Sequence, residues 1–355
     1  MERADVLIVG GGPAGSTCAT VLAAAGRDVL LVDAAKFPRD KPCGGWVTPE
    51  VLAEIPFSFD AYAKEHVAQP ISRFRIGRIG GRAVDVDYGT PVSYGIRRTE
   101  FDARLLQQSK ARIVEGERVK TIERENGDWV LNGRLAAPIL VGAGGHFCPI
   151  ARHVSEPADE RPVVAAREIE FRLSEEEASR CEIEQERPEL YFCADLRGYG
   201  WCFRKSNYLN VGLGRLDSAH LPAHLDAFLD VLKRERGLHV GGAGWRGHAY
   251  ALRHGRPRRV SGDSVVLVGD AAGLAAPASG EGILPAIISG RLAAEAILES
   301  RPEEYPARLD TRLGPRASAR RMPDRIAGLL GAALLAIPSF ARHVVLDRWF
   351  LHRSV

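Results

Sequence analysis

The sequence predicts an α/β protein with a discontinuous Rossmann-like nucleotide-binding domain, an inserted antiparallel-sheet domain and a helical C-terminal tail. A glycine turn of the kind that binds nucleotides occupies residues 10–15. A second strand, glycine turn and helix follow far along the chain, at residues 264–297. Between them, residues 73–94 and 163–215 alternate apolar and polar positions, which is typical of antiparallel strands with one buried face. The insertion must therefore split the nucleotide-binding domain.

The first turn is flanked by the elements that a dinucleotide-binding unit requires. Residues 5–9 are apolar and rich in β-branched side chains, which predicts a buried parallel strand. The G-x-G-x-x-G register permits a tight turn, close approach of a pyrophosphate, and close packing of the next helix. Residues 14–25 are alanine-rich and predict that helix, whose N-terminus favours phosphate. A second strand at residues 29–32 ends at Asp33, whose carboxylate can accept hydrogen bonds from adenosine ribose hydroxyls.

The second segment extends the prediction to the rest of one cofactor. Residues 264–268 predict another buried strand, which ends at Gly269 and Asp270. Open α/β sheets bind ligands at such strand ends, where Asp270 can accept a hydrogen bond from a ribityl hydroxyl. A helix is expected to begin near residues 280–282, and its N-terminus suits the flavin pyrimidine edge, where negative charge gathers on reduction. The cofactor that fits both segments is FAD.

With these motifs the chain resembles the p-hydroxybenzoate-hydroxylase-like flavoproteins, and within them the geranylgeranyl reductase family. Residues 98–105 are similar to the R-x-x-F-D-x-x-L element of the superfamily, whose arginine reaches the FAD. Residues 41–45 are similar to the cysteine–glycine–glycine turn beside the flavin in geranylgeranyl reductases, and residues 199–203 to that family's Y-x-W-x-F element on the substrate sheet. Val119 would hold the adenine through its backbone. Together, the predicted cofactor contacts are Gly10, Gly12, Pro13, Ala14, Gly15, Asp33, Cys43, Gly44, Gly45, Arg98, Val119, Gly269, Asp270, Pro277, Gly280, Gly282 and Ile283.

The resemblance implies an FAD-dependent oxidoreductase that reduces a carbon–carbon double bond in an isoprenoid or another hydrophobic substrate. Reduced FAD would supply the hydride, and solvent or a nearby tyrosine the proton. Cys43, Tyr199 and Trp201 are the candidate catalytic residues, although each also fits ordinary packing. Gly144 stands where the superfamily usually has an aspartate, which argues against an NADPH-fed hydroxylase. Arg204 replaces an expected proline, which suggests a pocket that admits an anionic headgroup.

Two other functions stay open. The first is a flavin-dependent monooxygenase or halogenase acting on a secondary metabolite, although the residues around Trp201 do not match the W-x-W-x-I-P signature of halogenases. The second is a non-catalytic flavin-binding protein of stress response or of the membrane surface. The electron donor also stays open between NAD(P)H, reduced ferredoxin and reduced flavin.

The order of the motifs along the chain predicts the domain bounds, and the net charge limits the possible partners. We expect an FAD-binding domain over residues 1–72, 95–160 and 255–300, a substrate domain over 73–94 and 161–254, and a helical segment over 301–355. The net charge of +3 gives no case for a nucleic-acid partner.

The last predictions concern the cellular location, metal binding and the C-terminal segment. Six cysteines without framework spacing predict reduced thiols and a cytoplasmic protein, and no apolar run is long enough to span a bilayer. No metal site is expected, because His220 and His224 lack further ligands. The tail has ten arginines against five acids, so its helices either pack on the domains or contact an anionic membrane peripherally.

Overall fold

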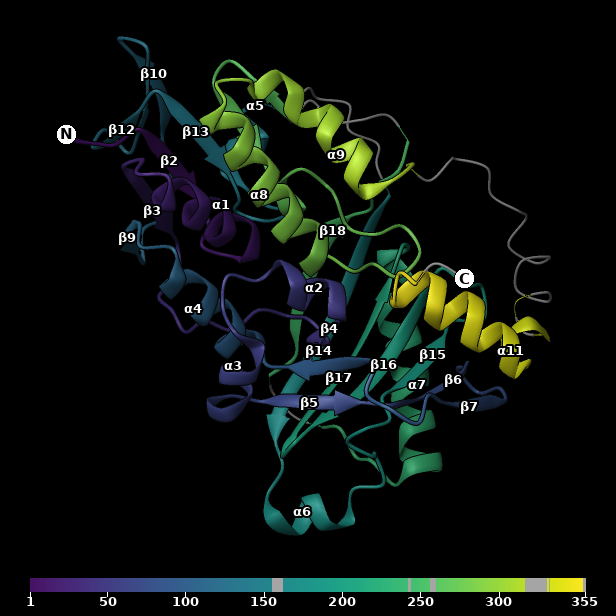
Figure 1. Cartoon of the computed structure of the whole chain (residues 1–355). Coiled ribbons are helices and arrows are strands. Elements are labelled where there is room, and N and C mark those ends of the chain that lie inside the picture. Colours follow the sequence, from purple (N-terminus) through teal and green to yellow (C-terminus); the bar gives the residue numbers. More distant parts are fainter. Residues whose placement is uncertain (155–161, 242–243, 256–259, 317–330, 332, 354–355) are drawn as a thin grey trace.

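The computed structural model describes residues 1–154, 162–241, 244–255, 260–316, 331 and 333–353 (Figure 1). Two large sheets dominate it, one mainly parallel and one mainly antiparallel, and the predicted α/β fold class is confirmed. The seven-stranded sheet occupies the lower half of the view, below the helices and strands of the nucleotide-binding region.

The mainly parallel sheet has six strands in the order β19-β20-β13-β2-β3-β9. Their bounds are β19 Ser261–Gly262, β20 Val265–Leu267, β13 Ile139–Gly142, β2 Val6–Val9, β3 Val29–Asp33 and β9 Arg112–Glu115. All neighbours run parallel except β19 and β20. The strands β2, β13 and β20, which are far apart in sequence, are thus adjacent at the centre of the sheet.

Two helices pack closely against each other beside this sheet. They are α1, Pro13–Ala24, and α8, Ile283–Leu298, and both match the sequence prediction. The contact is close because Gly290 of α8 faces the backbone of Ala14, where an added Cβ would overlap the Ala14 carbonyl oxygen. The helix α4, Arg98–Gln108, also packs on α1.

The seven-stranded sheet has the order β18-β14-β17-β16-β15-β6-β7. The bounds are β18 Arg246–Ala251, β14 Val163–Arg172, β17 Tyr208–Arg215, β16 Gly198–Lys205, β15 Glu189–Phe192, β6 Arg73–Arg78 and β7 Ala83–Asp87. Neighbouring strands are antiparallel except β15 and β6, which pair in parallel because the chain returns to this sheet after a long excursion. The helix α7, Leu221–Arg236, covers one face, where Phe228 packs against Gly200.

Smaller elements complete the core. A four-stranded sheet consists of β1 Glu2–Arg3, β12 Leu135–Ala137, β11 Asp128–Leu131 and β10 Ile122–Glu125. A three-stranded sheet consists of β4 Trp46–Val47, β8 Ser93–Ile96 and β5 Ala68–Ile71, so the end of the region predicted at residues 73–94 belongs to a different sheet. The short helices are α2 Pro49–Glu54, α3 Phe59–Glu65, α5 Pro149–Val154 and α6 Glu175–Arg180.

The first part of the C-terminal segment packs on α8, and its last helix packs on the seven-stranded sheet. Its described elements are α9 Tyr305–Leu313, α11 Pro338–Phe340 and the π-helix η4 Ala341–Phe350. Val345, Leu346 and Phe350 of η4 join the hydrophobic cluster around Phe74 of β6. Residues 329–337 of this segment are apolar and lie partly outside the described residues. No described helix is both long and apolar enough to cross a membrane.

Candidate active site

A cavity of about 610 Å³ collects residues from both large sheets. It brings together most of the residues singled out in the sequence. The predicted residues that line it are Gly10, Gly12, Pro13, Ala14, Asp33, Cys43, Gly44, Gly45, Arg98, Val119, Tyr199, Trp201, Gly269, Asp270, Gly280, Gly282 and Ile283. Gly144 lines it too, whereas Gly15 and Pro277 do not.

The two exceptions have structural explanations. Gly15 lies inside α1, and an added Cβ there would overlap the carbonyl oxygen of Gly10. A glycine at this position therefore lets α1 pack closely against the turn. This is the function expected of the third glycine in the motif. Pro277 is exposed in the turn that precedes Ser279 and Gly280.

Two helices begin at the cavity with backbone groups that no side chain caps. Gly12 is the N-cap of α1 and Gly282 the N-cap of α8, and both line the cavity. Gly10 has a φ of +112°, and a Cβ there would meet the Ala143 carbonyl oxygen. Free N–H groups at helix N-termini attract negative charge, so the start of α1 suits phosphate and the start of α8 suits the flavin pyrimidine edge.

Two charged side chains of this region are fixed by neighbours. The carboxylate of Asp33 accepts hydrogen bonds from the backbone N–H of Gly11 at 2.7 Å and of Ala35 at 2.8 Å. Arg98 donates two hydrogen bonds to Asp102, at 2.7 and 2.8 Å. Burial alone would lower the pKa of Arg98, but Asp102 and Cys43 together outweigh it and the pKa is raised. Arg98 therefore stays charged where it lines the cavity.

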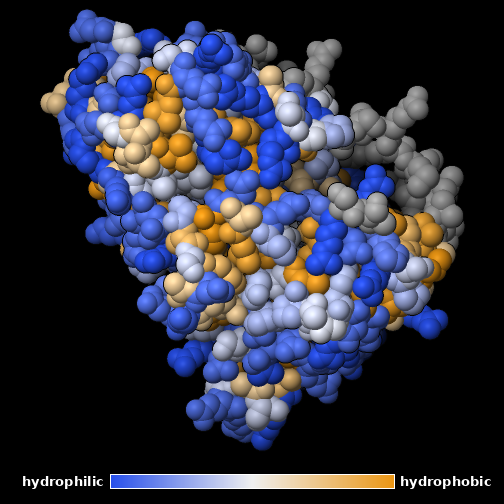
Figure 2. Space-filling model, viewed as in Figure 1, coloured by the Kyte–Doolittle hydropathy of each residue, from blue (hydrophilic) through white to orange (hydrophobic). Residues whose placement is uncertain are grey.

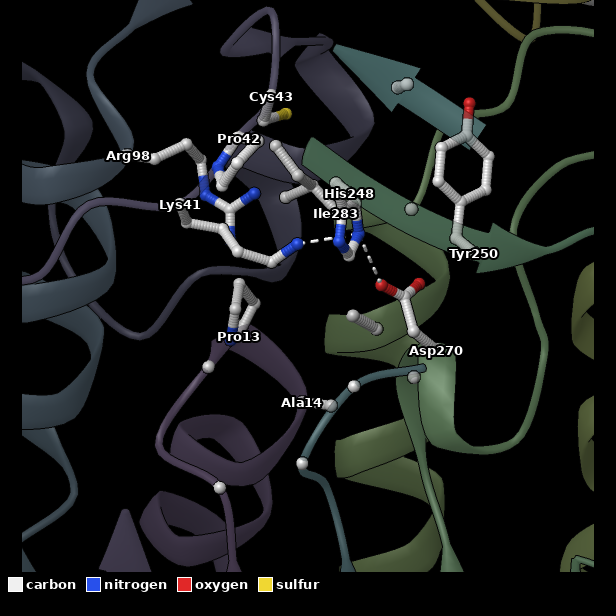
Figure 3. A pocket seen from close by; sticks show the side chains of 18 of the residues that line it. Pro13, Ala14, Lys41, Pro42, Cys43, Arg98, His248, Tyr250, Asp270 and Ile283 are labelled. Carbon is white, nitrogen blue, oxygen red and sulfur yellow. Dashed lines mark hydrogen bonds and ion pairs between the residues drawn. The ribbon is translucent and has the colours of Figure 1, made fainter. Parts of the chain in front are cut away.

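Three polar side chains that line the cavity contact one another in a row (Figure 3). Lys41 Nζ lies 2.7 Å from His248 Nε2, and that nitrogen lies 3.4 Å from Asp270 Oδ2. Burial lowers the pKa of Lys41 to about 8 and also lowers the pKa of His248. Burial would raise the pKa of Asp270, but His248 and Lys41 outweigh it and the pKa is lowered. The arrangement is a carboxylate, a neutral imidazole and a lysine ready to bind polar groups of a ligand.

The Cys43-Gly44-Gly45 turn is held between the two sheets. A Cβ on Gly44 would lie 3.1 Å from the Phe203 ring, and Gly45 has a φ of +68° with the Ile96 carbonyl against it. The buried Lys205 donates hydrogen bonds to the carbonyl oxygens of Gly44 at 3.1 Å and Ile96 at 3.0 Å. At Gly45 only a glycine fits, and at Gly44 a side chain would crowd the Phe203 ring, which gives the motif a physical reason.

The seven-stranded sheet turns alternate residues toward the cavity. Tyr199, Trp201 and Phe203 of β16 all line it. The hydroxyl of Tyr199 donates to the carbonyl oxygen of Ser279, and burial raises its pKa well above the ordinary value. Arg204 lies on the opposite face and donates to backbone carbonyls, including those of Cys181 and Ile183. The expectation that Arg204 admits an anionic headgroup is therefore wrong, because strand alternation points it away.

A cluster of aromatic side chains lies beside these residues of β16. Trp46 stacks on Phe350 of the C-terminal π-helix, with ring centroids 5.1 Å apart, and makes an edge contact with Phe203. Phe350 also makes an edge contact with Tyr199. Trp46, Phe350 and Leu190 all line the cavity, so this end is apolar.

Several lining residues were missed by sequence reasoning: Lys41, Trp46, Glu168, His248, Tyr250 and Phe350. Lys205, also missed, supports the glycine turn from behind. The spacing of His248 and Tyr250 on one strand was a usable signal, since both must face the same side. Phe350 had none, because only tertiary packing brings the C-terminal helix to the cavity.

The residues present fit FAD. The uncapped N-terminus of α1 and its glycine turn suit the pyrophosphate, and the N-terminus of α8 suits the flavin ring. The carboxylates Asp33 and Asp270 suit hydroxyl groups at two places in one cavity. Within the described part of the chain, no group of three or more metal-ligating side chains is arranged to hold a metal ion. No cysteine of the described residues takes part in a disulfide.

Comparisons with known proteins agree with this geometry. Residues 5–136 match the family model described as FAD dependent oxidoreductase. The menaquinone reductase of Mycobacterium tuberculosis is 33% identical, with 96% of this chain and 86% of that protein covered. The geranylgeranyl diphosphate reductase of Rhodobacter capsulatus is 30% identical, with 86% and 78% covered.

A solved structure has the same fold. It is a geranylgeranyl bacteriochlorophyll reductase-like protein from Thermoplasma acidophilum, with a TM-score of 0.75 and 22% identity. The match covers 100% of this chain and 94% of that one. The overall fold is thus shared with a solved protein.

Proposed function

Because this chain belongs to the FAD-dependent geranylgeranyl reductase family, we propose that it reduces a carbon–carbon double bond of an isoprenoid or another hydrophobic substrate. Menaquinone and geranylgeranyl diphosphate, the molecules in the names of its relatives, both carry an isoprenoid chain. The names of the relatives and the apolar end of the cavity therefore both favour an apolar substrate.

The observation that carries the proposal is the aromatic wall. Trp46 contacts both Phe203 and Phe350, and all three line a cavity that the glycine turn after Cys43 also lines. Removing apolar surface from water stabilises binding by roughly 25 cal/mol per Å². A prenyl chain, which offers only such surface, is the ligand that this wall would favour.

The side chains of this protein have distinct functions in the proposal. Bound FAD would supply the hydride. The glycine turns would hold its phosphates, and Asp33 and Asp270 its hydroxyl groups. The aromatic wall would orient the substrate and exclude water, and the Cys43-Gly44-Gly45 turn would set the distance between the wall and the cofactor.

Anaerobic turnover tests the proposal. Protein reduced with dithionite is mixed with geranylgeranyl diphosphate or with menaquinone, and the product is analysed by mass spectrometry and proton NMR. We expect two added hydrogens per reduced double bond in the prenyl chain. Reduction confined to the quinone ring, or no product from either compound, would contradict the proposal. A product that forms only with dioxygen and contains its oxygen would instead indicate a monooxygenase.

The electron donor is tested with the same protein. NADPH, NADH, reduced ferredoxin and reduced free flavin are compared by the rate at which each bleaches the bound flavin. Gly144 lines the cavity in place of the usual aspartate, so we propose that the donor acts without an acidic partner at that position.

We also propose that the C-terminal segment contacts an anionic membrane surface. Leu334 and Ile337 are 38% and 45% exposed, and the cation Arg348 on η4 is exposed as well. Figure 2 shows hydrophobic residues on the side of the molecule where α11 and η4 lie. Co-sedimentation with phosphatidylglycerol vesicles, but not with phosphatidylcholine vesicles, is expected. Equal recovery after the double change Leu334→Asp and Ile337→Asp would contradict this contact.

A further inference from the structure

A carboxyl group that no sequence motif marks lies beside the aromatic wall. Glu168 of β14, Gly212 of β17 and Trp201 of β16 are opposite one another in register across three strands. Because Gly212 has no side chain, the Trp201 ring occupies the space where a Cβ would be, and Glu168 Cβ lies 2.8 Å from that point. Glu168 is only 4% exposed, yet it lines the cavity together with Trp201.

The hydrogen bonds around Asn210 indicate where a proton is held. Its Oδ1 accepts from Trp201 Nε1 at 2.7 Å. Its Nδ2, with two hydrogens, faces three oxygens: Cys43 O at 3.2 Å, Glu168 Oε2 at 3.3 Å and Glu170 Oε2 at 3.2 Å. Two hydrogens cannot serve three acceptors fully. A proton on one of the two carboxyl groups would relieve the shortage.

The neighbouring cations decide which carboxyl group is protonated. Lys205 Nζ lies 2.5 Å from Glu170 Oε2, and Arg97 Nε lies 3.1 Å from Glu170 Oε1. Among the described residues, no cation is within ion-pair distance of Glu168. The nearest candidate by register is Arg246, and its Nε pairs with Asp40 at 2.9 Å. Glu170 is thus the carboxylate and Glu168 the group that retains a proton.

The electrostatic surroundings agree with this assignment. Burial raises the pKa of Glu168 to about 7, and the charge of Glu170 raises it too. The Cys43 backbone, Lys205 and Asn210 lower it, but not enough to offset burial. A group with a pKa near the working pH is suited to general acid catalysis, because it holds its proton and can still release it.

We propose that Glu168 delivers the proton that completes reduction of the substrate double bond. This inference rests on the proposed function. The double bond accepts a hydride, the two-electron reductant that the bound cofactor supplies, at one carbon. The other carbon takes the Glu168 proton as the carbon–carbon π bond breaks, so two C–H bonds form. The Glu168 carboxylate then regains a proton from water.

The tyrosines at the cavity are less suited to this step. The Tyr199 hydroxyl already donates to Ser279, and burial raises the pKa of Tyr199 and of Tyr250 above the ordinary value. Either phenol would therefore release a proton less readily than Glu168.

The first test compares E168Q with wild type, using dithionite-reduced protein and geranylgeranyl diphosphate in single turnovers. Glutamine keeps the size of the side chain and an acceptor for Asn210, but it carries no acidic proton. We expect product formation to fall at least about 100-fold, the usual contribution of a general acid. In wild type the rate should fall as pH rises through about 7, and in E168Q this inflection should be absent. A rate for E168Q within about threefold of wild type, with the inflection kept, would overturn the proposal.

The matched variant is E170Q, which changes the other carboxyl group on the same face of β14. Removing its charge, and freeing Lys205 to interact with Glu168, should both lower the pKa of Glu168. The inflection in the rate should therefore move to lower pH. An unchanged inflection in folded E170Q would contradict the assignment.

A second measurement needs no turnover. Infrared pH-difference spectra of the oxidised protein should show the carbonyl band of a protonated carboxyl that is lost as pH rises through about 7 and is missing in E168Q. If wild type reduces neither isoprenoid probe, the proposed function fails. If the band is not present in wild type, the proton-donor proposal fails even where the protein reduces its substrate.

Discussion

The two walls of the cavity are built in different ways. The nucleotide-binding wall consists mainly of backbone groups, which belong to the glycine turns and to the N-termini of α1 and α8 beside the mainly parallel sheet. The opposite wall uses side chains, contributed by alternate residues of β14, β16 and β18 and by the C-terminal helix. Where the backbone segments of the first wall approach most closely, no added Cβ fits. The side chains of the opposite wall can instead be replaced one at a time, and each replacement changes the chemistry of the cavity. This difference explains how one fold can keep its cofactor while its substrate varies.

The largest loss of stability is expected where the side-chain wall buries a charge. Lys205→Met would remove the cation from Glu170 and the donor from the Gly44 and Ile96 carbonyls. Breaking a buried ion pair by removing one partner costs about 3–5 kcal/mol. Urea denaturation measures this loss. The double variant with Glu170→Gln should recover part of it, and a double variant no better than the single one would contradict the pairing.

The next effect tests the backbone wall. Gly15→Ala would place a Cβ against the Gly10 carbonyl and push α1 away from the turn. We expect a colourless protein that stays colourless with added FAD, and a free energy of unfolding lower by about 1–3 kcal/mol. Gly241→Ala is the control, because a Cβ there meets nothing within 4 Å. A yellow Gly15→Ala protein would show that the close packing is dispensable.

A third change separates the two walls. The Cβ that Gly212→Ala adds would collide with the Trp201 ring. Gly212 itself does not line the cavity, so the change does not touch the cofactor site directly. We expect bound flavin to remain while substrate reduction falls about tenfold or more, because Trp201 shifts. Gly214→Ala lies on the same strand, with its nearest contact at 3.4 Å, and should behave like wild type. Equal activity of the two variants would mean that Trp201 does not set substrate position.

The smallest effect concerns pH. Burial lowers the pKa of His248, so below the unfolded value of about 6.5 the unfolded chain binds a proton that the folded chain resists. His248 therefore favours folding above that pH, and the contribution is lost as pH falls toward 5. Lys41 stays charged in both states over this range and adds no slope. Denaturation curves at several pH values should show a shallower loss for His248→Gln than for wild type, and parallel curves would contradict a neutral buried imidazole.

Much of the backbone wall could be predicted because its signals are local. A strand, a glycine register and a helix start lie within a few residues of one another, and close packing permits few alternatives at Gly10, Gly15 or Gly45. The same reasoning failed for Arg204, where the residue type was noted but its strand face was not considered. Pro277 was assigned to the cofactor from a motif, although the turn leaves it exposed.

The sequence by itself determined the α/β class, the cofactor and the turn that faces it, because glycine positions and apolar runs act through short-range sterics and burial. Only the tertiary structure decided that Glu168, His248 and Phe350 line one cavity and that Lys205 supports the glycine turn beside it. These residues come from separate strands and from the C-terminal helix, and their proximity depends on register and long-range packing. The protonation of Glu168 and of His248 follows from their burial, which no local pattern encodes.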